Sequence, residues 1–200
     1  MNHHWKCIVC GAALVGQAAF AGAAPIIDQD QSDAAQTVAT FGQPDLAQSF
    51  QQTNNNIAGA GVYVAPSDEP SPTATISVWD DLPNQPGAMM LASGSGTIVP
   101  GGFFDVFWAP VPVSPGVTYF LTFEAPGALY DIKGRLADVY PFGNAYANAG
   151  YVSFPNFDFA FRTYYEPVPE PMAWSLLVAG LAGLSATRLA RRRADAVRSN

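Results

Sequence analysis

Closely spaced carboxylates are the first residues of this chain that could do chemistry. Asp80-Asp81 follows the alternating run Thr73–Trp79, so the pair could hold a cation or a sugar at a sheet edge. A solvated turn is the alternative. The run from Asp28 to Asp33 (DQDQSD) has the alternating oxygens that begin a calcium loop, but it lacks the central glycine and the terminal glutamate. We expect an acidic N-terminal segment here and predict no cofactor and no metal site, with Ca²⁺ left open.

Paired carboxylates hydrolyse glycosides when one is protonated and its partner is ionised at a fixed separation. The chain has acidic residues in and beside its predicted strands, but nothing in their spacing makes two of them face each other. We therefore predict that the protein is not an enzyme, and keep a carboxylate-dependent glycoside hydrolase as a third hypothesis. The residues available for it are Asp105, Glu124, Asp131, Asp138 and Asp158.

Aromatic side chains favour sugar binding, because their ring faces stack on pyranose rings. The two tryptophans Trp79 and Trp108 lie at the ends of predicted strands, the first beside Asp80 and Asp81. We predict these four residues as the possible ligand contacts. A place in the hydrophobic core is the alternative for any one aromatic residue. Further aromatic candidates are Tyr130, Tyr140, Tyr146 and Tyr151.

The N-terminus has the order of a secretory signal peptide. Lys6 precedes an apolar run from Cys7 to Phe20, and Ala21-Gly22-Ala23 is the small-residue cleavage pattern. Cleavage after Ala23 keeps Pro25 out of the first mature position. Two alternatives are a lipoprotein processed at Cys10 and a retained N-terminal anchor. We predict export across the inner membrane and cleavage by signal peptidase.

Cleavage at this position removes every cysteine and histidine of the chain. These residues are His3, His4, Cys7 and Cys10, and the C-x-x-C spacing falls inside the apolar signal segment. The mature chain therefore has no disulfide framework, no Cys/His zinc site and no Ser-His-Asp or Cys-His nucleophile.

The C-terminus combines a proline-flanked acid, an apolar run and a basic tail. Pro169-Glu170-Pro171 precedes residues 172–187, whose length is at the short limit for a membrane-spanning helix. Basic residues after the run should stay in the cytoplasm and leave the body of the protein on the far side of the inner membrane. An ordinary single-span anchor with a proline-rich stalk is the alternative. The tail at 188–200 contains Arg188, Arg191, Arg192 and Arg193.

This order of segments resembles the PEP-CTERM sorting signal of Gram-negative bacteria. The resemblance implies recognition and cleavage by an exosortase, with Pro169, Glu170 and Pro171 as the sorting motif. It also implies that the membrane anchor is transient, and that the protein then passes to the cell envelope or the extracellular polysaccharide.

The charge of the exported part is strongly acidic. From Ala24 to Glu166 there are fourteen acidic residues against three basic ones, a net charge of −11. Such a surface repels phosphate backbones, so we predict no nucleic-acid partner.

The sequence between the two terminal segments predicts an all-β domain. Thr73–Trp79 and Val117–Glu124 alternate apolar and polar residues, as do Phe157, Phe159 and Phe161. Asp28 to Gln36 is expected to fray, and Leu136 to Gly150 to form an irregular loop or a weak hairpin. We predict a signal peptide at 1–23, a polar segment at 24–44, an antiparallel two-sheet sandwich of jelly-roll type at 45–166, the Pro-rich motif at 167–171, the span and the tail. Further strands are predicted at Ala47–Phe50, Gly59–Val64, Met89–Ala92, Phe103–Trp108 and Leu129–Lys133.

The succession of strands is similar to the β-sandwich ectodomains that precede PEP-CTERM signals and are related to carbohydrate-binding-like folds. The similarity covers Ala47 to Tyr164 and includes Gln48-Ser49-Phe50, Ser77-Val78-Trp79-Asp80 and Phe159-Ala160-Phe161. The first hypothesis is therefore an exported, non-catalytic envelope or matrix protein. The alternative is a surface carbohydrate-binding module, for which polysaccharide is the partner.

Overall fold

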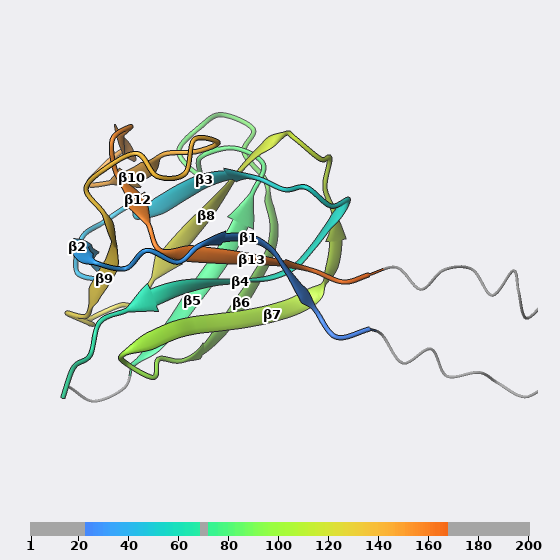
Figure 1. Ribbon diagram of the computed structural model, residues 1–200. Helices are drawn as coiled ribbons and strands as arrows, with labels where there is room; N and C mark the ends of the chain where they lie inside the picture. Colours follow the sequence, from blue (N-terminus) through green and yellow to red (C-terminus); the bar gives the residue numbers. More distant parts are fainter. Residues whose placement is uncertain (1–22, 69–71, 168–200) are drawn as a thin grey trace, which may run out of the picture.

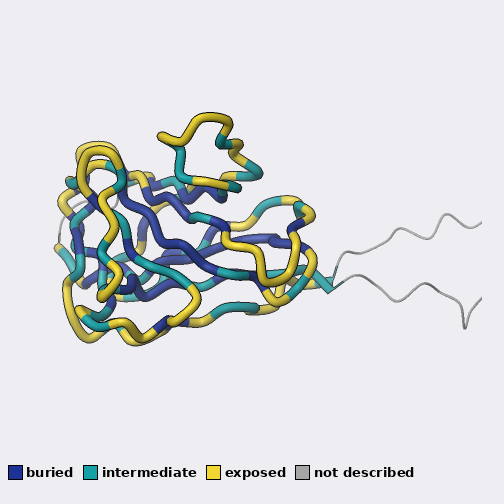
Figure 2. The backbone as a smooth tube through the Cα atoms, turned by 90° about the horizontal axis from the view of Figure 1, so that it is seen from above, coloured by how far each residue is buried: buried dark blue, intermediate teal, exposed yellow. Residues whose placement is uncertain are grey.

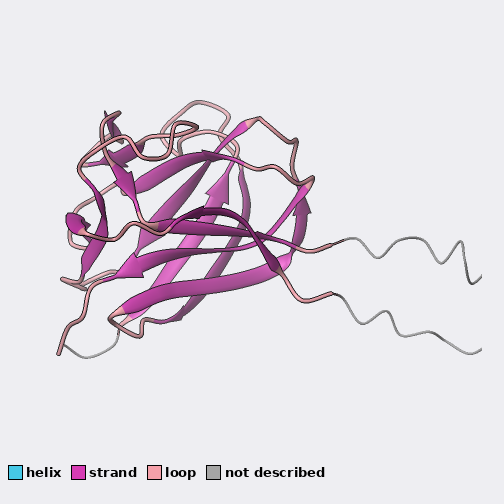
Figure 3. Cartoon of the chain, in the orientation of Figure 1, coloured by secondary structure: helices cyan, strands magenta, loops and turns pink. Residues whose placement is uncertain are grey.

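The computed structural model describes residues 23–68 and 72–167, and every regular element in these residues is a β-strand (Figures 1 and 3). No helix in this part of the chain could cross a membrane, and the predicted span at 172–187 lies outside the described residues. The strands form one seven-stranded and one six-stranded sheet, and the strand pairs are antiparallel. The all-β prediction with two antiparallel sheets is therefore confirmed.

The seven-stranded sheet is built around β4. β4 pairs with β7 on one side and with β13 on the other. β1 pairs with the far edge of β13. Strand β9 meets the end of β4 and pairs with β2 and β12. The strands are β1 (Ile26–Gln31), β2 (Gln36–Thr40), β4 (Asn56–Val64), β7 (Gly102–Pro112), β9 (Asp131–Arg135), β12 (Asp158–Phe159) and β13 (Phe161–Tyr165).

The six-stranded sheet has the order β11-β10-β3-β8-β5-β6. Its edge strand β6 lies beside β7, the edge of the other sheet, where a Cβ on Gly94 would be 3.0 Å from Cβ of Val106. The two sheets therefore approach each other closely along this side. The strands are β3 (Ala47–Gln51), β5 (Thr73–Trp79), β6 (Met90–Thr97), β8 (Thr118–Glu124), β10 (Ala145–Ala147) and β11 (Val152–Phe154).

The hydrophobic core lies between the sheets, where Figure 2 shows the buried strands enclosed by exposed loops. Ala74, Ile76 and Val78 of β5 are buried, as are alternate residues of β8, because side chains of a strand point to opposite faces. Phe123 of β8 contacts Phe159 of β12 edge to face, with ring centroids 5.5 Å apart. The alternation seen in the sequence therefore identified the inward faces correctly.

The two strands with the clearest alternation form where they were expected. β5 has the predicted bounds, and β8 begins one residue later than predicted, at Thr118, with Val117 exposed. The run from Phe157 is interrupted at Ala160, so it forms β12 and β13 instead of one strand. β10 lies within the predicted loop or weak hairpin at 136–150, and its partner β11 follows that segment.

The expectation that Asp28 to Gln36 is frayed is wrong. β1 pairs with β13 and β2 pairs with β9, so the predicted polar segment at 24–44 contains two strands of the seven-stranded sheet. Edge strands tolerate polar sequences because both their faces can stay partly solvated. Their pairing depends on backbone groups offered by β9 and β13, which are distant in sequence.

Candidate functional site

The predicted ligand contacts Trp79, Asp80 and Asp81 lie together where β5 ends. Asp80 Oδ1 accepts the Met89 N–H at 2.7 Å, and Asp81 Oδ1 accepts the Leu82 N–H at 2.7 Å. Both carboxylates therefore order the loop between β5 and β6. The indole Nε1 of Trp79 is buried and has no hydrogen-bond partner among the described residues.

Trp108 lies in β7 of the other sheet and does not join this group. Its Nε1 donates to the Ile57 carbonyl at 3.1 Å, and its ring packs against the core. Tyr146 contacts Phe120 on the outer face of the six-stranded sheet, with centroids 5.8 Å apart, whereas Tyr130 and Tyr140 are buried. The predicted aromatic contacts are thus distributed over both sheets and the core.

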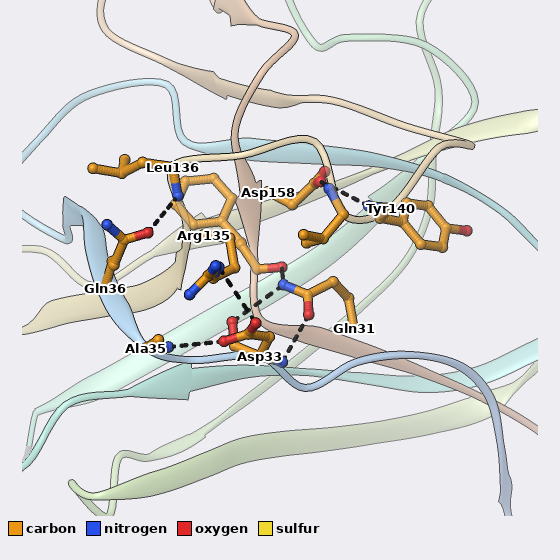
Figure 4. Close-up of polar contacts among 10 residues, drawn as sticks. Gln31, Asp33, Ala35, Gln36, Arg135, Leu136, Tyr140 and Asp158 are labelled. Atoms are coloured by element: carbon orange, nitrogen blue, oxygen red, sulfur yellow. Dashed lines mark hydrogen bonds and ion pairs between the residues drawn. The ribbon is translucent and has the colours of Figure 1, made fainter.

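The acidic residues considered for hydrolysis do not gather in one cleft. Asp158 is 1% exposed, and its Oδ2 accepts the N–H groups of Val139 and Tyr140 at 2.8 and 2.9 Å (Figure 4). Its Oδ1 accepts Gln48 Nε2 at 3.1 Å. Burial raises the pKa of Asp158, although these hydrogen bonds work in the opposite direction. This carboxylate therefore holds the loop after β9 against both sheets.

The three acids of the calcium-like run have separate partners. Asp28 accepts the backbone N–H groups of Thr53 and Asn54, and Asp30 pairs with Arg162. Asp33 pairs with Arg135 (Figure 4). Within residues 23–68 and 72–167 no group of three or more acidic, histidine or cysteine residues is placed to hold a metal ion.

The predicted sorting and topology residues fall outside the part of the chain that the structure describes. They are Ala21, Pro169, Glu170, Pro171, Arg188, Arg191, Arg192 and Arg193. Ala23 is described and lies three residues before the start of β1.

A small pocket of about 220 Å³ lies where two loops meet. Asp45 and Tyr151 line it with φ values of 56°, and Asn148 nearby has a φ of 66°, a backbone region that non-glycine residues rarely adopt. The Gly150 N–H donates to Asp45 Oδ2, 2.6 Å away, and this bond ties the loops together. Burial raises the pKa of Tyr151 to about 12. Because the Asp45 carboxylate is already engaged, we assign this pocket to loop packing.

The most developed surface site lies on the outer face of β7, β4 and β13. Phe104 and Val106 of β7 point into the core, so Phe103, Asp105 and Phe107 point outward. In register they lie beside Tyr63, Gly61 and Gly59 of β4, and beyond β4 come Arg162 and Tyr164 of β13. We call this surface the β7 platform. It consists of Tyr63, Phe103, Asp105, Phe107, Arg162 and Tyr164 over Gly59 and Gly61.

Two glycines let the β7 side chains lie across the sheet. A Cβ on Gly59 would be 2.6 Å from Cδ1 of Phe107, and a Cβ on Gly61 would collide with Asp105 Oδ1. The phenyl ring and the carboxylate therefore occupy the space that side chains on β4 would fill. Glycine inside a strand commonly marks such a close approach.

The rings of the platform contact each other and the guanidinium group. Phe103 lies edge to face with Tyr63 at 5.3 Å, and Phe107 with Tyr164 at 5.0 Å. The guanidinium carbon of Arg162 lies 3.6 Å from the ring centroid of Phe103, in the geometry of a cation–π contact. Phe107 nevertheless remains 53% exposed. The platform is thus an ordered cluster of rings, of which Phe107 is open to solvent.

Charges of both signs cross the centre of the platform. Asp105, Gly61, Arg162 and Asp30 are successive cross-strand neighbours, and Arg162 Nε lies 3.4 Å from Asp30 Oδ1. Burial raises the pKa of Asp105, while the Tyr164 hydroxyl and the Arg162 charge lower it. Burial also raises the pKa of Tyr164 to about 12.

One oxygen of Asp105 is left without a hydrogen bond. Oδ1 is buried and has no partner among the described residues, an arrangement that costs on the order of 1–3 kcal/mol. Buried unsatisfied groups of this kind are rare and often accompany a functional site. A groove of about 450 Å³ adjoins Phe103, Asp105 and Phe107 and extends to Ser95 and Thr97 of β6.

Sequence reasoning included Asp105 among the acids but missed the platform. Arg162 is one of only three basic residues between Ala24 and Glu166, which is a signal in so acidic a chain. The other available signal was Gly59-Ala60-Gly61 inside a predicted strand, because glycines there indicate close approach of another group.

Comparisons of the chain with protein-family models, with curated proteins and with solved structures found no match.

Proposed function

We propose that this chain is an exported, non-catalytic protein of the Gram-negative cell envelope or extracellular matrix. The observation that carries the proposal is the order of Pro169-Glu170-Pro171, the apolar run 172–187 and the arginine-rich tail. An exosortase recognises and cleaves this signal after signal peptidase has acted behind Ala23. The apolar run is a transient helical anchor in the inner membrane.

The position of the chain ends supports this topology. β1 and β13 pair with Ile26 opposite Tyr165, so the described chain begins and ends at the same end of the sandwich (Figure 1). Signal peptide and anchor are therefore attached side by side, and both can reach one membrane while the rest of the sandwich faces away from it. We propose a jelly-roll topology, supported by the many side-by-side strands that are not consecutive in sequence.

The exit toward the sorting signal is fixed by one buried side chain. Asn56 Nδ2 donates to the Glu166 carbonyl at 2.9 Å, and Asn56 Oδ1 accepts the Glu166 N–H at 2.9 Å. Glu166 is four residues before Glu170. The end of β13 is thus held to β4 four residues before Glu170, which supports a role for the motif as a signal separate from the sandwich.

Intact-mass measurement of the protein from hosts with and without exosortase tests the sorting proposal. We expect a shortened C-terminus only where exosortase is present, and Glu170→Gln should leave the chain full-length in both hosts. Glu166→Gln, a matched change at the end of the sandwich, should be processed normally. An identical full-length C-terminus of the parent protein in both hosts would refute sorting by cleavage.

Surface carbohydrate binding is the second candidate function. The β7 platform favours it, because the exposed Phe107 ring lies beside hydrogen-bonding groups on one face of the sandwich. Glycan-array binding by the full-length protein separates this function from a purely structural role. A carboxylate-dependent hydrolase has less support, since Asp158 is buried and engaged in three hydrogen bonds. If hydrolysis persisted after replacement of the acidic residues, the carboxylate-dependent mechanism would be refuted.

A further inference from the structure

We propose that the β7 platform binds a neutral pyranose unit of a polysaccharide. The ring of Phe107 stacks on the apolar face of the sugar, and the hydroxyl groups bind beside Arg162. This inference rests on the second candidate function and assigns it to a site. It concerns a different face of the protein from Trp79, Asp80 and Asp81.

The shape of the platform suits a flat ring. Gly59 and Gly61 leave room for Phe107 and Asp105 to lie across β4, and a side chain at either position would lift them. Tyr164 supports the Phe107 ring from its edge, so one ring face remains available. Sugar rings present axial C–H groups to such faces, and their contact requires little rearrangement of a preordered ring.

The charges of the platform select a neutral ligand. Asp30 and Asp105 lie in the same cross-strand row as Arg162, so hydrogen-bond acceptors and donors alternate over a short distance. A sugar hydroxyl both donates and accepts and therefore matches both. Two carboxylates disfavour uronic acids and sulfated sugars, whereas Arg162 disfavours a cation. A purely apolar partner would cover these groups without pairing them.

Two features leave these polar groups available to a ligand. The Arg162 and Asp30 side chains are 26% and 40% exposed, and a guanidinium has five N–H donors, of which Nε faces Asp30. Asp105 Oδ1 is already dehydrated and has no partner in the described part of the chain. It can accept a hydroxyl donor once the side chain turns away from Gly61.

The adjoining groove indicates a chain of sugars. It has a volume of about 450 Å³ and extends from Phe103, Asp105 and Phe107 to the hydroxyl-bearing residues Ser95 and Thr97 of β6. Small-molecule sites typically have volumes of about 300–1,000 Å³. A pyranose on Phe107 therefore has room for a neighbouring unit along the seam between β6 and β7.

Calorimetric titration of the full-length protein with neutral hexasaccharides tests the proposal. The probes are cellohexaose, laminarihexaose and mannohexaose, with hexagalacturonic acid as the charged comparison, and the detergent must be free of sugar, such as lauryldimethylamine oxide. We expect binding of at least one neutral probe and at least tenfold weaker binding of the uronic acid. Failure of all three neutral probes to bind would overturn the proposal.

Variants then locate the bound sugar. Phe107→Ala should weaken binding at least tenfold, and the shape-conserving Asp105→Asn at least fivefold. Phe142→Ala, a similarly exposed phenylalanine far along the chain from the platform, should change affinity less than twofold. Thermal melting establishes that each variant is folded. If the probe binds both platform variants as tightly as the parent, the site is refuted while carbohydrate binding and sorting remain unaffected.

Discussion

At the scale of single residues, the protein uses its buried polar groups to join elements that are distant in sequence. Gln48 accepts the Phe159 N–H at 2.9 Å and donates to Asp158, and Gln52 accepts the Thr163 hydroxyl at 2.8 Å. These side chains are almost fully buried, and each polar contact spans more than a hundred residues. Loss of one partner leaves the others unpaired in the core.

Replacement of Asp158 by alanine should destabilise the fold. The N–H groups of Val139 and Tyr140 and the Gln48 amide would lose their acceptor. We expect a loss of about 3 kcal/mol in the free energy of unfolding, measured by urea denaturation. The exposed neighbour Asp138, replaced by alanine, should cost less than about 0.5 kcal/mol. Equal effects of the two substitutions would contradict a structural role for Asp158.

Asp105 should make stability depend on pH. Burial raises its pKa above 3.8, so between 3.8 and the raised value the folded state binds more protons than the unfolded chain. Its stabilising contribution is complete below that window and is lost as pH rises through it. Asp105→Asn should therefore gain stability relative to the parent as the pH rises above 3.8, measured by urea midpoints. The exposed Asp68→Asn provides the baseline, and a constant difference for Asp105→Asn would contradict the prediction.

At the scale of elements, the alternation of apolar and polar residues predicted the inward faces of the strands well. It did not predict which strands pair with each other. The faces of β5 and β8 follow from a side-chain period of two, which is a local property. β1 and β2 were not predicted, because their sequences are polar. They form strands by pairing with the backbones of β13 and β9. The platform was not predicted for the same reason. The register of the paired strands makes neighbours of four residues that are distant in sequence: Asp30, Gly61, Asp105 and Arg162.

The junction of β4 and β13 should depend on Asn56. Asn56→Ala removes both hydrogen bonds to Glu166, and we expect a loss of about 1–2 kcal/mol of stability. Hydrogen exchange at the Tyr165 and Glu166 amides should accelerate at least tenfold. The exposed Asn156→Ala is the matched control and should leave both exchange rates unchanged. Unchanged exchange in Asn56→Ala would show that the β-ladder alone holds this end.

At the scale of the whole molecule, the sandwich presents two faces and one end with distinct properties. Both ends of the described chain leave at the same end, the β7 platform occupies one outer face, and the loop after β5 lies with the other sheet. Residues 24–166 carry a net charge of −11, and this acidic surface is compatible with the export that we propose. A sandwich tethered at that end leaves both faces open to the surroundings.

Cysteine labelling should reveal the topology of the precursor. Ser93→Cys, on exposed β6, should react with a membrane-impermeant maleimide in intact spheroplasts lacking exosortase. Ser199→Cys, in the basic tail, should react only after lysis, because the arginines keep it in the cytoplasm. The proposed signal-peptide cleavage removes native Cys7 and Cys10, so the parent protein should stay unlabelled and is the control. Labelling of both positions only after lysis would contradict export.

The sequence alone was sufficient for the all-β class and for the inward faces of the main strands, because these depend on local composition and on a period of two. The tertiary structure decided the rest. It placed β1 beside β13, buried Asp158 among donors from distant loops and assembled charges and rings from β1, β4, β7 and β13. Such contacts depend on strand register across more than a hundred residues, and no local pattern encodes that register.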